Sequence, residues 1–324
     1  MTQALHLPPN VSFRDEHPDL GDGREMILAG LEATPRRANP MWFYDKRGSE
    51  LFDEITRLPE YYPTRTEVAL LKRYAPEISD CCGPACTLIE PGSGSSDKVR
   101  LLLDSLRPAA YVPVDISAEF LREAASALGL EYPWLTVNAV CADFNGEWSF
   151  LDDLPQNKHV VFYPGSTLGN LEPAAARRFL RGMTEVVGTS GGVLIGVDRH
   201  KDRATLEAAY NDRDGVTAAF NLNILERFNA LLDADFDATR FRHHAFYNES
   251  AHRIEMHLVS IGDQEVTAGG RRLRFADGET IHTENSYKYS DEDFSALAAD
   301  AGFQVRHFWT DEDRLFGLYY LEHA

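Results

Sequence analysis

Cysteines and long apolar segments are both scarce in this sequence. The 324 residues include four cysteines, Cys81, Cys82, Cys86 and Cys141. A zinc site would need a further ligand at suitable spacing, and adjacent cysteines rarely pair, so we expect reduced structural thiols. No segment approaches the roughly 18 consecutive apolar residues of a membrane span, and the N-terminal residues lack an apolar core of signal-peptide length. The sequence therefore predicts a cytoplasmic protein with no membrane partner.

Basic residues are also under-represented. Lysine and arginine together number 32, against 51 aspartates and glutamates, which gives a formal net charge of −19. A surface with this charge repels phosphate backbones, so we expect a small-molecule target and no nucleic-acid partner. Hydrophobic residues make up 44% of the chain, enough for the core of one large domain or two modest ones.

From Thr87 onward, apolar segments of strand length alternate with amphipathic segments of helix length. This alternation predicts a parallel sheet with right-handed crossover helices. It breaks after Asp198 and returns at 291–301, a helical pattern followed by two strand-like runs. We predict strands at 87–91, 110–115, 135–140, 159–163, 192–198, 303–309 and 315–321, and helices at 96–106, 117–128, 173–187 and 291–301.

A glycine turn, EPGSGSSDK, lies between the first of these strands and the helix that follows. Gly92 and Gly94 allow a tight turn and close approach of a ligand to the backbone, although an ordinary strand-to-helix turn would look similar. Asp115 ends the second strand 21 positions after Gly94, a spacing suited to binding ribose hydroxyls. Asp143 and Phe144 end the third strand, where an acid and an aromatic ring suit an adenine.

Three nucleotide-binding features at successive strand ends resemble the class I S-adenosylmethionine-dependent methyltransferases. A dinucleotide dehydrogenase also explains the glycine turn and Asp115. It does not call for Asp143 and Phe144, and Asp97 stands where its third glycine belongs. The resemblance implies an α/β fold with a seven-stranded Rossmann-like sheet whose last strand is antiparallel. The predicted methyltransferase domain comprises 65–199 and 289–324, and an α+β substrate-binding domain comprises 12–64 and 200–288.

Aromatic residues are concentrated before the glycine turn, between 42 and 62. They suit a hydrophobic core, because aromatic side chains bury large areas. However, the sequence Tyr-Tyr-Pro-Thr-Arg-Thr-Glu that begins at Tyr61 breaks the helical periodicity. We therefore expect a shaped loop there that directs phenol hydroxyls into a cleft.

Nine motifs in order extend the resemblance from about residue 25 to the C-terminus. Together they are similar to the histidine-specific N-alpha-methyltransferases, which trimethylate the amino group of L-histidine to give hercynine, the first intermediate of ergothioneine synthesis. The motifs are WFYD (42–45), LPEYYPTRTE (58–67), GSGSSDK (92–98), PVDIS (113–117), ADF (142–144), GSTLGNL (165–171), GVTAAFNLN (215–223), RIEMHL (253–258) and TENSYKY (283–289).

The resemblance also implies roles for individual residues. Tyr44 and Tyr61 would face the substrate amine, Asn170 would hold the amino and carboxylate groups, and Tyr210 would bind the carboxylate. Gly165 belongs to the same loop as Asn170. Imidazole recognition would fall to Glu284 and Ser286, with Met256 lining the same wall. S-adenosylmethionine would contact Gly92, Gly94, Lys98, Asp115, Asp143 and Phe144.

The spacing of Glu284 and Ser286 supports imidazole recognition independently of the resemblance. Residues two apart on a strand share a face, so a carboxylate and a hydroxyl can each meet one ring nitrogen. An exposed strand of alternating polarity would show the same pattern.

Methyl transfer also requires the amine to lose a proton, because the free amine is largely protonated at neutral pH. We expect Tyr44 or Tyr61 to accept or relay this proton.

The sequence is also compatible with other functions. The acceptor could be tryptophan or a thiolated histidine, or the protein could bind S-adenosylmethionine without catalysis. We expect a monomer with no metal, because solvated or core roles suit the histidines better than ligation. Those considered are His159, His200, His243, His244 and His257.

Overall fold

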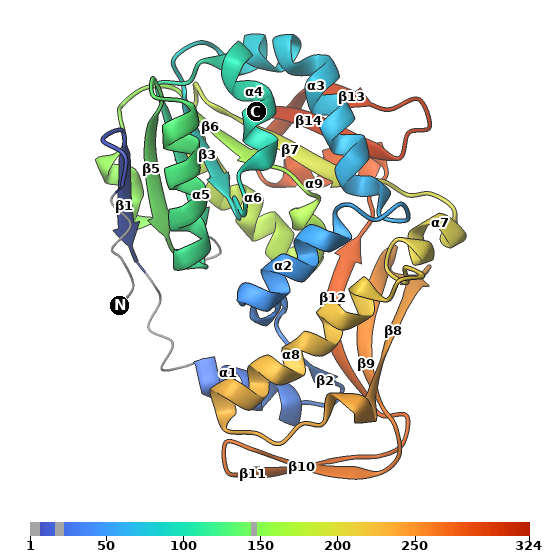
Figure 1. Cartoon of the computed structure of the whole chain (residues 1–324). Helices are drawn as coiled ribbons and strands as arrows, with labels where there is room; N and C mark the ends of the chain where they lie inside the picture. Colours follow the sequence, from blue (N-terminus) through green and yellow to red (C-terminus); the bar gives the residue numbers. More distant parts are fainter. Residues whose placement is uncertain (1–6, 17–22, 144–147) are drawn as a thin grey trace.

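The computed structural model of the chain describes residues 7–16, 23–143 and 148–324 (Figure 1). The strands of these segments form a large sheet, a smaller four-stranded sheet and a two-stranded hairpin. None of the described helices is both long enough and apolar enough to cross a membrane. The predicted cofactor residue Phe144 lies outside the described residues.

The large sheet has the strand order β1-β5-β4-β3-β6-β7-β14-β13. β14 runs antiparallel to both of its neighbours, and the remaining pairs of the sheet are parallel. The methyltransferase-like sheet with an antiparallel last strand is therefore confirmed. Its strands are β1 (Val11–Asp15), β3 (Thr87–Pro91), β4 (Ala110–Asp115), β5 (Thr136–Cys141), β6 (His159–Tyr163), β7 (Gly192–Asp198), β13 (Phe303–Thr310) and β14 (Phe316–His323).

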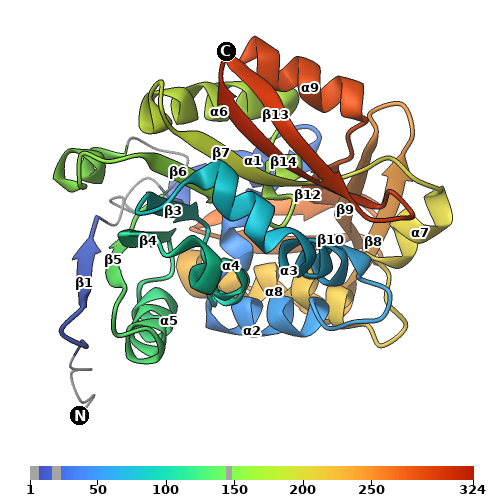
Figure 2. The ribbon, with the colours of Figure 1, turned by 90° about the horizontal axis from the view of Figure 1, so that it is seen from above.

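Helices cover both faces of the large sheet, which explains why its central strands are almost continuously apolar. Helices α3 to α5 pack on one face and α6 and α9 on the other (Figure 2). These helices are α3 (Tyr62–Cys82), α4 (Asp97–Leu106), α5 (Ala118–Glu131), α6 (Pro173–Val187) and α9 (Asp291–Asp300). The chain also forms short 3₁₀ turns η3 (Ser149–Asp153) and η4 (Thr167–Asn170) beside them.

The prediction of seven strands was wrong by one, because β1 adds an eighth. It pairs in parallel with β5, from Val11 opposite Val137 to Asp15 opposite Cys141. The side chain of Asn10 anchors the strand by donating to the backbone carbonyls of Gly129, Tyr132 and Leu135. Residues 12–15 therefore belong to the large sheet, not to the substrate-binding part in which the sequence placed them.

The segments 23–62 and 200–288 form the second part of the molecule around one hydrophobic core. Its sheet has the order β2-β12-β9-β8, and β2 comes from the N-terminal segment. Its elements are α1 (Gly23–Glu32), β2 (Arg36–Arg37), η2 (Pro40–Phe43), α2 (Lys46–Ile55), α7 (Arg203–Ala208), α8 (Val216–Leu232), η5 (Ala238–Arg240), β8 (Phe241–Asn248), β9 (Arg253–Ser260), β10 (Gln264–Ala268), β11 (Arg271–Phe275) and β12 (Thr280–Tyr287).

The second part leaves the large sheet and returns to it at one place, the carboxyl end of β7. The backbone N–H of Tyr289 donates to the carbonyl of Asp198 at 3.1 Å, and the N–H of His200 donates to the carbonyl of Tyr289 at 3.3 Å. Parallel α/β sheets bind ligands at this edge. The connection therefore places β12, which precedes Tyr289, over the ligand-binding edge.

The expected loop at Tyr61 was also wrong, because α3 begins at Tyr62. Pro63 lies in its first turn, where a missing N–H costs no helical hydrogen bond. The buried residues Thr66, Leu70 and Leu71 of the first turns then set the inward face. Tyr61 precedes the helix as its N-cap residue, so its side chain is held at a helix start.

Candidate active site

A cavity of about 720 Å³ lies between the large sheet and the second part of the molecule. This is within the range of small-molecule sites, roughly 300–1,000 Å³. Every described residue that the sequence predicts for the site lines it. They are Tyr44, Tyr61, Gly92, Gly94, Lys98, Asp115, Asp143, Gly165, Asn170, Tyr210, Met256, Glu284 and Ser286.

The glycine turn and Asp115 form one hydrogen-bonded unit. Gly92 and Gly94 have φ values of 68° and 51°, a region that glycine occupies without strain. The carboxylate of Asp115 accepts from the backbone N–H groups of Gly94 and Ser117, each at 3.0 Å. Burial raises the pKa of Asp115, and these backbone hydrogen bonds oppose that rise. The unit presents an oriented carboxylate to the cavity.

Lys98 is joined to the loop that carries Gly165 through a buried glutamate. Its ammonium pairs with Glu67 at 2.6 Å, and Glu67 is fully buried. The same carboxylate accepts from the backbone N–H of Gly165 at 2.9 and 3.0 Å. Lys98 therefore helps to fix the position of the glycine turn relative to the loop that carries Gly165. Its charge is compensated by Glu67 before any ligand binds.

Glu90, the first residue of the EPGSGSSDK turn, is a cavity residue that the sequence analysis missed. Burial raises its pKa to about 8, although a hydrogen bond from the hydroxyl of Tyr111 opposes this. The signal was present, because an acid at the last positions of a buried strand is unusual.

Three tyrosines from different segments meet in the cavity. The ring of Tyr61 lies 6.2 Å from that of Tyr210, edge to face, and Tyr44 packs in the same way against Phe52 and Phe220 at 5.9 and 6.0 Å. Burial, reinforced by nearby acidic groups, raises the pKa of Tyr44 and of Tyr61 well above its usual value. Both phenols stay protonated near neutral pH, so neither suits the role of a phenolate base.

Glu284 and Ser286 reach the cavity from β12, while Asn285 between them points elsewhere and donates to Glu172 at 3.1 Å. This agrees with the shared face expected from their spacing. A register shift lies between His282 and Glu284, and Glu284 pairs with Met256 on β9. Burial raises the pKa of Glu284 to about 7, although the ammonium of Lys288 lowers it.

A buried charged network lies behind Ser286. The ammonium of Lys288 donates to the hydroxyls of Ser286 at 2.7 Å and Tyr210 at 3.2 Å, and it pairs with Asp198 at 2.7 Å. Lys201 and the hydroxyl of Tyr62 also bind Asp198. Burial alone would raise the pKa of Asp198, but Lys288 and Lys201 lower it.

This network directs the hydrogen of Ser286. The serine oxygen accepts from Lys288 and, at 2.8 Å, from the hydroxyl of Tyr210. Its own single hydrogen is then available to a ligand acceptor in the cavity. The carboxylate-binding role predicted for Tyr210 requires its hydrogen to turn away from Ser286, and it stays a prediction.

Sequence comparison agrees with this geometry. A family model described as "Histidine-specific methyltransferase, SAM-dependent" matches residues 23–323 of the chain. The chain belongs to this family.

Individual relatives of the chain differ in their acceptors. The chain is 44% identical to a histidine N-alpha-methyltransferase of Mycolicibacterium smegmatis, over 91% of this chain and 93% of that protein. It is 30% identical to ergothioneine biosynthesis protein 1 of Neurospora crassa, over 89% of this chain and 33% of that protein. A 4-dimethylallyltryptophan N-methyltransferase of Claviceps purpurea is 25% identical, over 98% and 99% of the two chains.

Besides Glu90, sequence reasoning missed a group of charged residues that pair with one another beside the cavity, and one of them, Asp198, lines it. Lys288 lies far from Asp198 in sequence, so its pairing with Asp198 depends on the return of the chain to β7, whereas Lys201 is only three residues from Asp198. The available sequence signal for Lys288 was its place within the TENSYKY motif, and the structure buries it there. Outside the cavity, the described residues include a group able to hold a metal ion, Glu255, His257 and His282.

Proposed function

We propose that this protein transfers methyl groups from S-adenosylmethionine to the α-amino nitrogen of L-histidine, three times, giving hercynine for ergothioneine biosynthesis. The observation that carries the proposal is that Glu284 and Ser286 line the same cavity as the glycine turn and Asp115. One half of the cavity suits a nucleoside and the other half suits an imidazole. Family membership supports both assignments.

The residues at the ends of β3, β4 and β5 fit the methyl donor. Asp115 offers a carboxylate in the cavity to ribose hydroxyls, and Asp143 offers another to an adenine amino group. An added Cβ at Gly94 would meet nothing within 4 Å, so the turn leaves open space for a ligand beside the backbone. When bound there, S-adenosylmethionine supplies a methyl group on a positively charged sulfur.

Glu284 and Ser286 recognise opposite edges of the imidazole. The carboxylate of Glu284 accepts the ring N–H, and Ser286 donates the hydrogen that Lys288 and Tyr210 leave available to the other nitrogen. This arrangement selects a neutral ring in one tautomer. An analogue without these groups would leave buried polar atoms unpaired, which can cost roughly 10⁴-fold in specificity.

Tyr44 and Tyr61 position the amine, and neither acts as a strong base. Their oxygens accept amine N–H groups, which orients the nitrogen lone pair, and positioning of this kind supplies most of the rate. Because both phenols stay protonated, neither is the final proton acceptor, and the proton of the amine passes to solvent either directly or through a relay by one phenol hydroxyl. Phenol rings attract the quaternary ammonium product by roughly 0.5–2 kcal/mol.

A panel of acceptors tests the proposal. Release of S-adenosylhomocysteine is measured with L-histidine, L-tryptophan, a thiolated histidine and L-alanine at equal concentrations. The proposal predicts the highest kcat/KM for histidine. Turnover of tryptophan alone would overturn the assignment of histidine as the substrate. No turnover with any acceptor would favour a protein that binds S-adenosylmethionine without catalysis.

We also propose that one domain binds S-adenosylmethionine and a second domain binds the substrate. We further propose that the enzyme is monomeric and cytoplasmic. The methyltransferase domain comprises 65–199 and 289–324, now with β1 added, and the substrate-binding domain comprises the remaining N-terminal segment and 200–288. Support comes from the separate hydrophobic cores of the two parts. Light scattering of the purified protein, with and without ligands, tests the monomer.

A further inference from the structure

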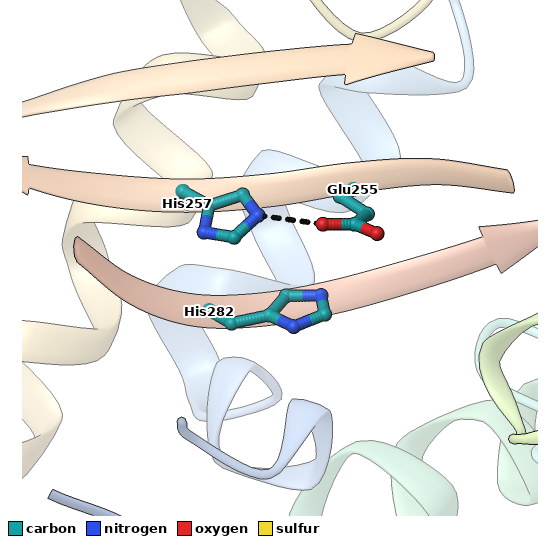
Figure 3. A group of neighbouring side chains, drawn as sticks. All are labelled: Glu255, His257 and His282. Carbon is teal, nitrogen blue, oxygen red and sulfur yellow. Dashed lines mark hydrogen bonds and ion pairs between the residues drawn. The ribbon is translucent and has the colours of Figure 1, made fainter. Parts of the chain in front are cut away.

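Three side chains converge on the face of the small sheet that points away from the cavity (Figure 3). Glu255 and His257 lie two residues apart on β9, and His282 lies directly opposite His257 on β12. One nitrogen or oxygen atom from each residue lies within 4.8 Å of the corresponding atoms of the other two. The Nε2 atom of His257 donates to Glu255 at 3.0 Å.

We propose that Glu255, His257 and His282 bind a divalent transition-metal ion, for which zinc is the best match. Two imidazoles and one carboxylate are a common set of zinc ligands, and they leave a fourth position for water. Hard ions such as magnesium and calcium prefer oxygen ligands, so they fit this set poorly.

The ligands are held by a rigid frame and by neighbouring polar groups. Asn248 and Arg253 donate to one oxygen of Glu255, each at 2.8 Å, which leaves the other oxygen facing the histidines. Such supporting contacts orient ligands in metal sites.

Asn285 provides an independent observation. Its side chain interacts with the imidazole of His282. Among the described residues, no group makes a hydrogen bond of normal geometry to its buried Oδ1 atom. When Nε2 of His282 binds a metal, its hydrogen must reside on Nδ1, and Asn285 supplies an acceptor for it. A buried acceptor beside a ligating histidine is the outer partner that such a site needs.

The geometry sets the expected affinity. Zinc bonds of about 2.0–2.2 Å place tetrahedral ligand atoms about 3.3–3.6 Å apart. The His257 and Glu255 atoms, now 3.0 Å apart, must open slightly to admit the ion, and His282 must adjust its position within the present 4.8 Å limit. The imidazoles now stack at 4.5 Å with their planes 15° apart, and one must rotate about χ2, a soft torsion. We therefore expect binding in the micromolar range, weaker than in structural zinc sites.

Metal binding at Glu255, His257 and His282 would affect the cavity through β12, which also carries Glu284. The Nε2 atom of His282 now donates to the backbone carbonyl of Glu284 at 3.1 Å, and a metal would replace this hydrogen bond. Because Glu284 faces the imidazole of the substrate under the proposed function, zinc should raise the KM for histidine. This consequence rests on the proposed function, whereas metal binding itself does not.

Calorimetric titration of the full chain with zinc alone tests the site, without histidine or S-adenosylmethionine. We expect one ion per chain, at least tenfold weaker binding in His257→Gln and in His282→Gln, and no change in the control His307→Gln on β13. Equal binding by all variants, or no binding by the wild type, would overturn the site.

Cobalt spectroscopy removes any dependence on how the variants fold. Co²⁺ bound to the wild-type protein should show visible bands of a four-coordinate ion, and six-coordinate spectra would contradict the ligand set. For the coupling, KM for histidine is compared in wild type and His257→Gln at a fixed concentration of free zinc, since histidine itself chelates zinc. A rise in both proteins alike would refute the coupling.

Discussion

Replacement of Glu284 tests the imidazole half of the site. Its carboxylate lies in the cavity beside Tyr44 and Tyr61, and burial raises its pKa to about 7. In Glu284→Gln the amide oxygen still accepts a hydrogen bond from the ring N–H, but the charge is lost. In Glu284→Ala the acceptor itself is lost, and the ring N–H is left unpaired. We therefore expect kcat/KM for histidine to fall in the order wild type, glutamine, alanine.

The structure gives approximate sizes for these losses. A hydrogen bond to a charged group contributes about 1.5–3 kcal/mol and a neutral one about 0.5–1.5 kcal/mol. The glutamine variant keeps a neutral hydrogen bond, so it should lose about 1–1.5 kcal/mol, or about 5- to 13-fold. The alanine variant loses the whole contribution of about 1.5–3 kcal/mol. Leaving a buried donor unpaired adds about 1–3 kcal/mol, which brings the alanine variant to roughly 10²- to 10⁴-fold.

The assay is steady-state methylation of histidine, together with calorimetric binding of S-adenosylmethionine. Both Glu284 variants should bind S-adenosylmethionine as the wild type does, because Glu284 belongs to the substrate half. Glu265→Gln, an exposed carboxylate on β10, is the matched control and should change neither measurement. Histidine kinetics in Glu284→Ala equal to those of the wild type would refute the reasoning.

Three further predictions concern pH, the buried network and the methyl donor. The kcat/KM for histidine should rise as Glu284 ionises around pH 7, since the carboxylate is the better acceptor, and a pH profile of Glu284→Gln that kept this inflection would assign it to another group. Lys288→Met should destabilise the protein by about 3 kcal/mol in urea unfolding, because Asp198 keeps only part of its compensation. Adding Asp198→Asn should recover part of this loss, and additive losses would contradict the pairing. Asp115→Asn should weaken S-adenosylmethionine binding at least tenfold by calorimetry and leave the pH inflection in place, whereas unchanged affinity would contradict its ribose role.

The fold could be predicted where local pattern and tertiary context agree. The predicted boundaries of the strands at 87–91, 110–115, 159–163 and 192–198 match β3, β4, β6 and β7, because strands buried on both faces are mostly apolar. β1 was missed because a five-residue edge strand with polar residues resembles a loop until its partner is known. The start of α3 was missed because the sequence that begins at Tyr61 was judged to break helical periodicity, although Pro63 suits the first turn of a helix.

Placement of the candidate site followed from motifs, but its electrostatics did not. Spacing alone indicated that Glu284 and Ser286 share a face, and the structure places both in the cavity. The network of Lys288 with Asp198 depends on how β12 leads back to β7, which no local pattern encodes. Likewise, His257 meets His282 only through the register of β9 with β12.

Mass spectrometry of the methylated product shows directly whether the protein trimethylates the amino group of histidine. Purified protein is incubated with S-adenosylmethionine and L-histidine, and the product is followed over time and fragmented to locate the methyl groups. The account predicts successive gains of one, two and three methyl groups, all on the α-amino nitrogen. Methyl groups on the imidazole ring, or no methylation of histidine while another acceptor is methylated, would contradict it.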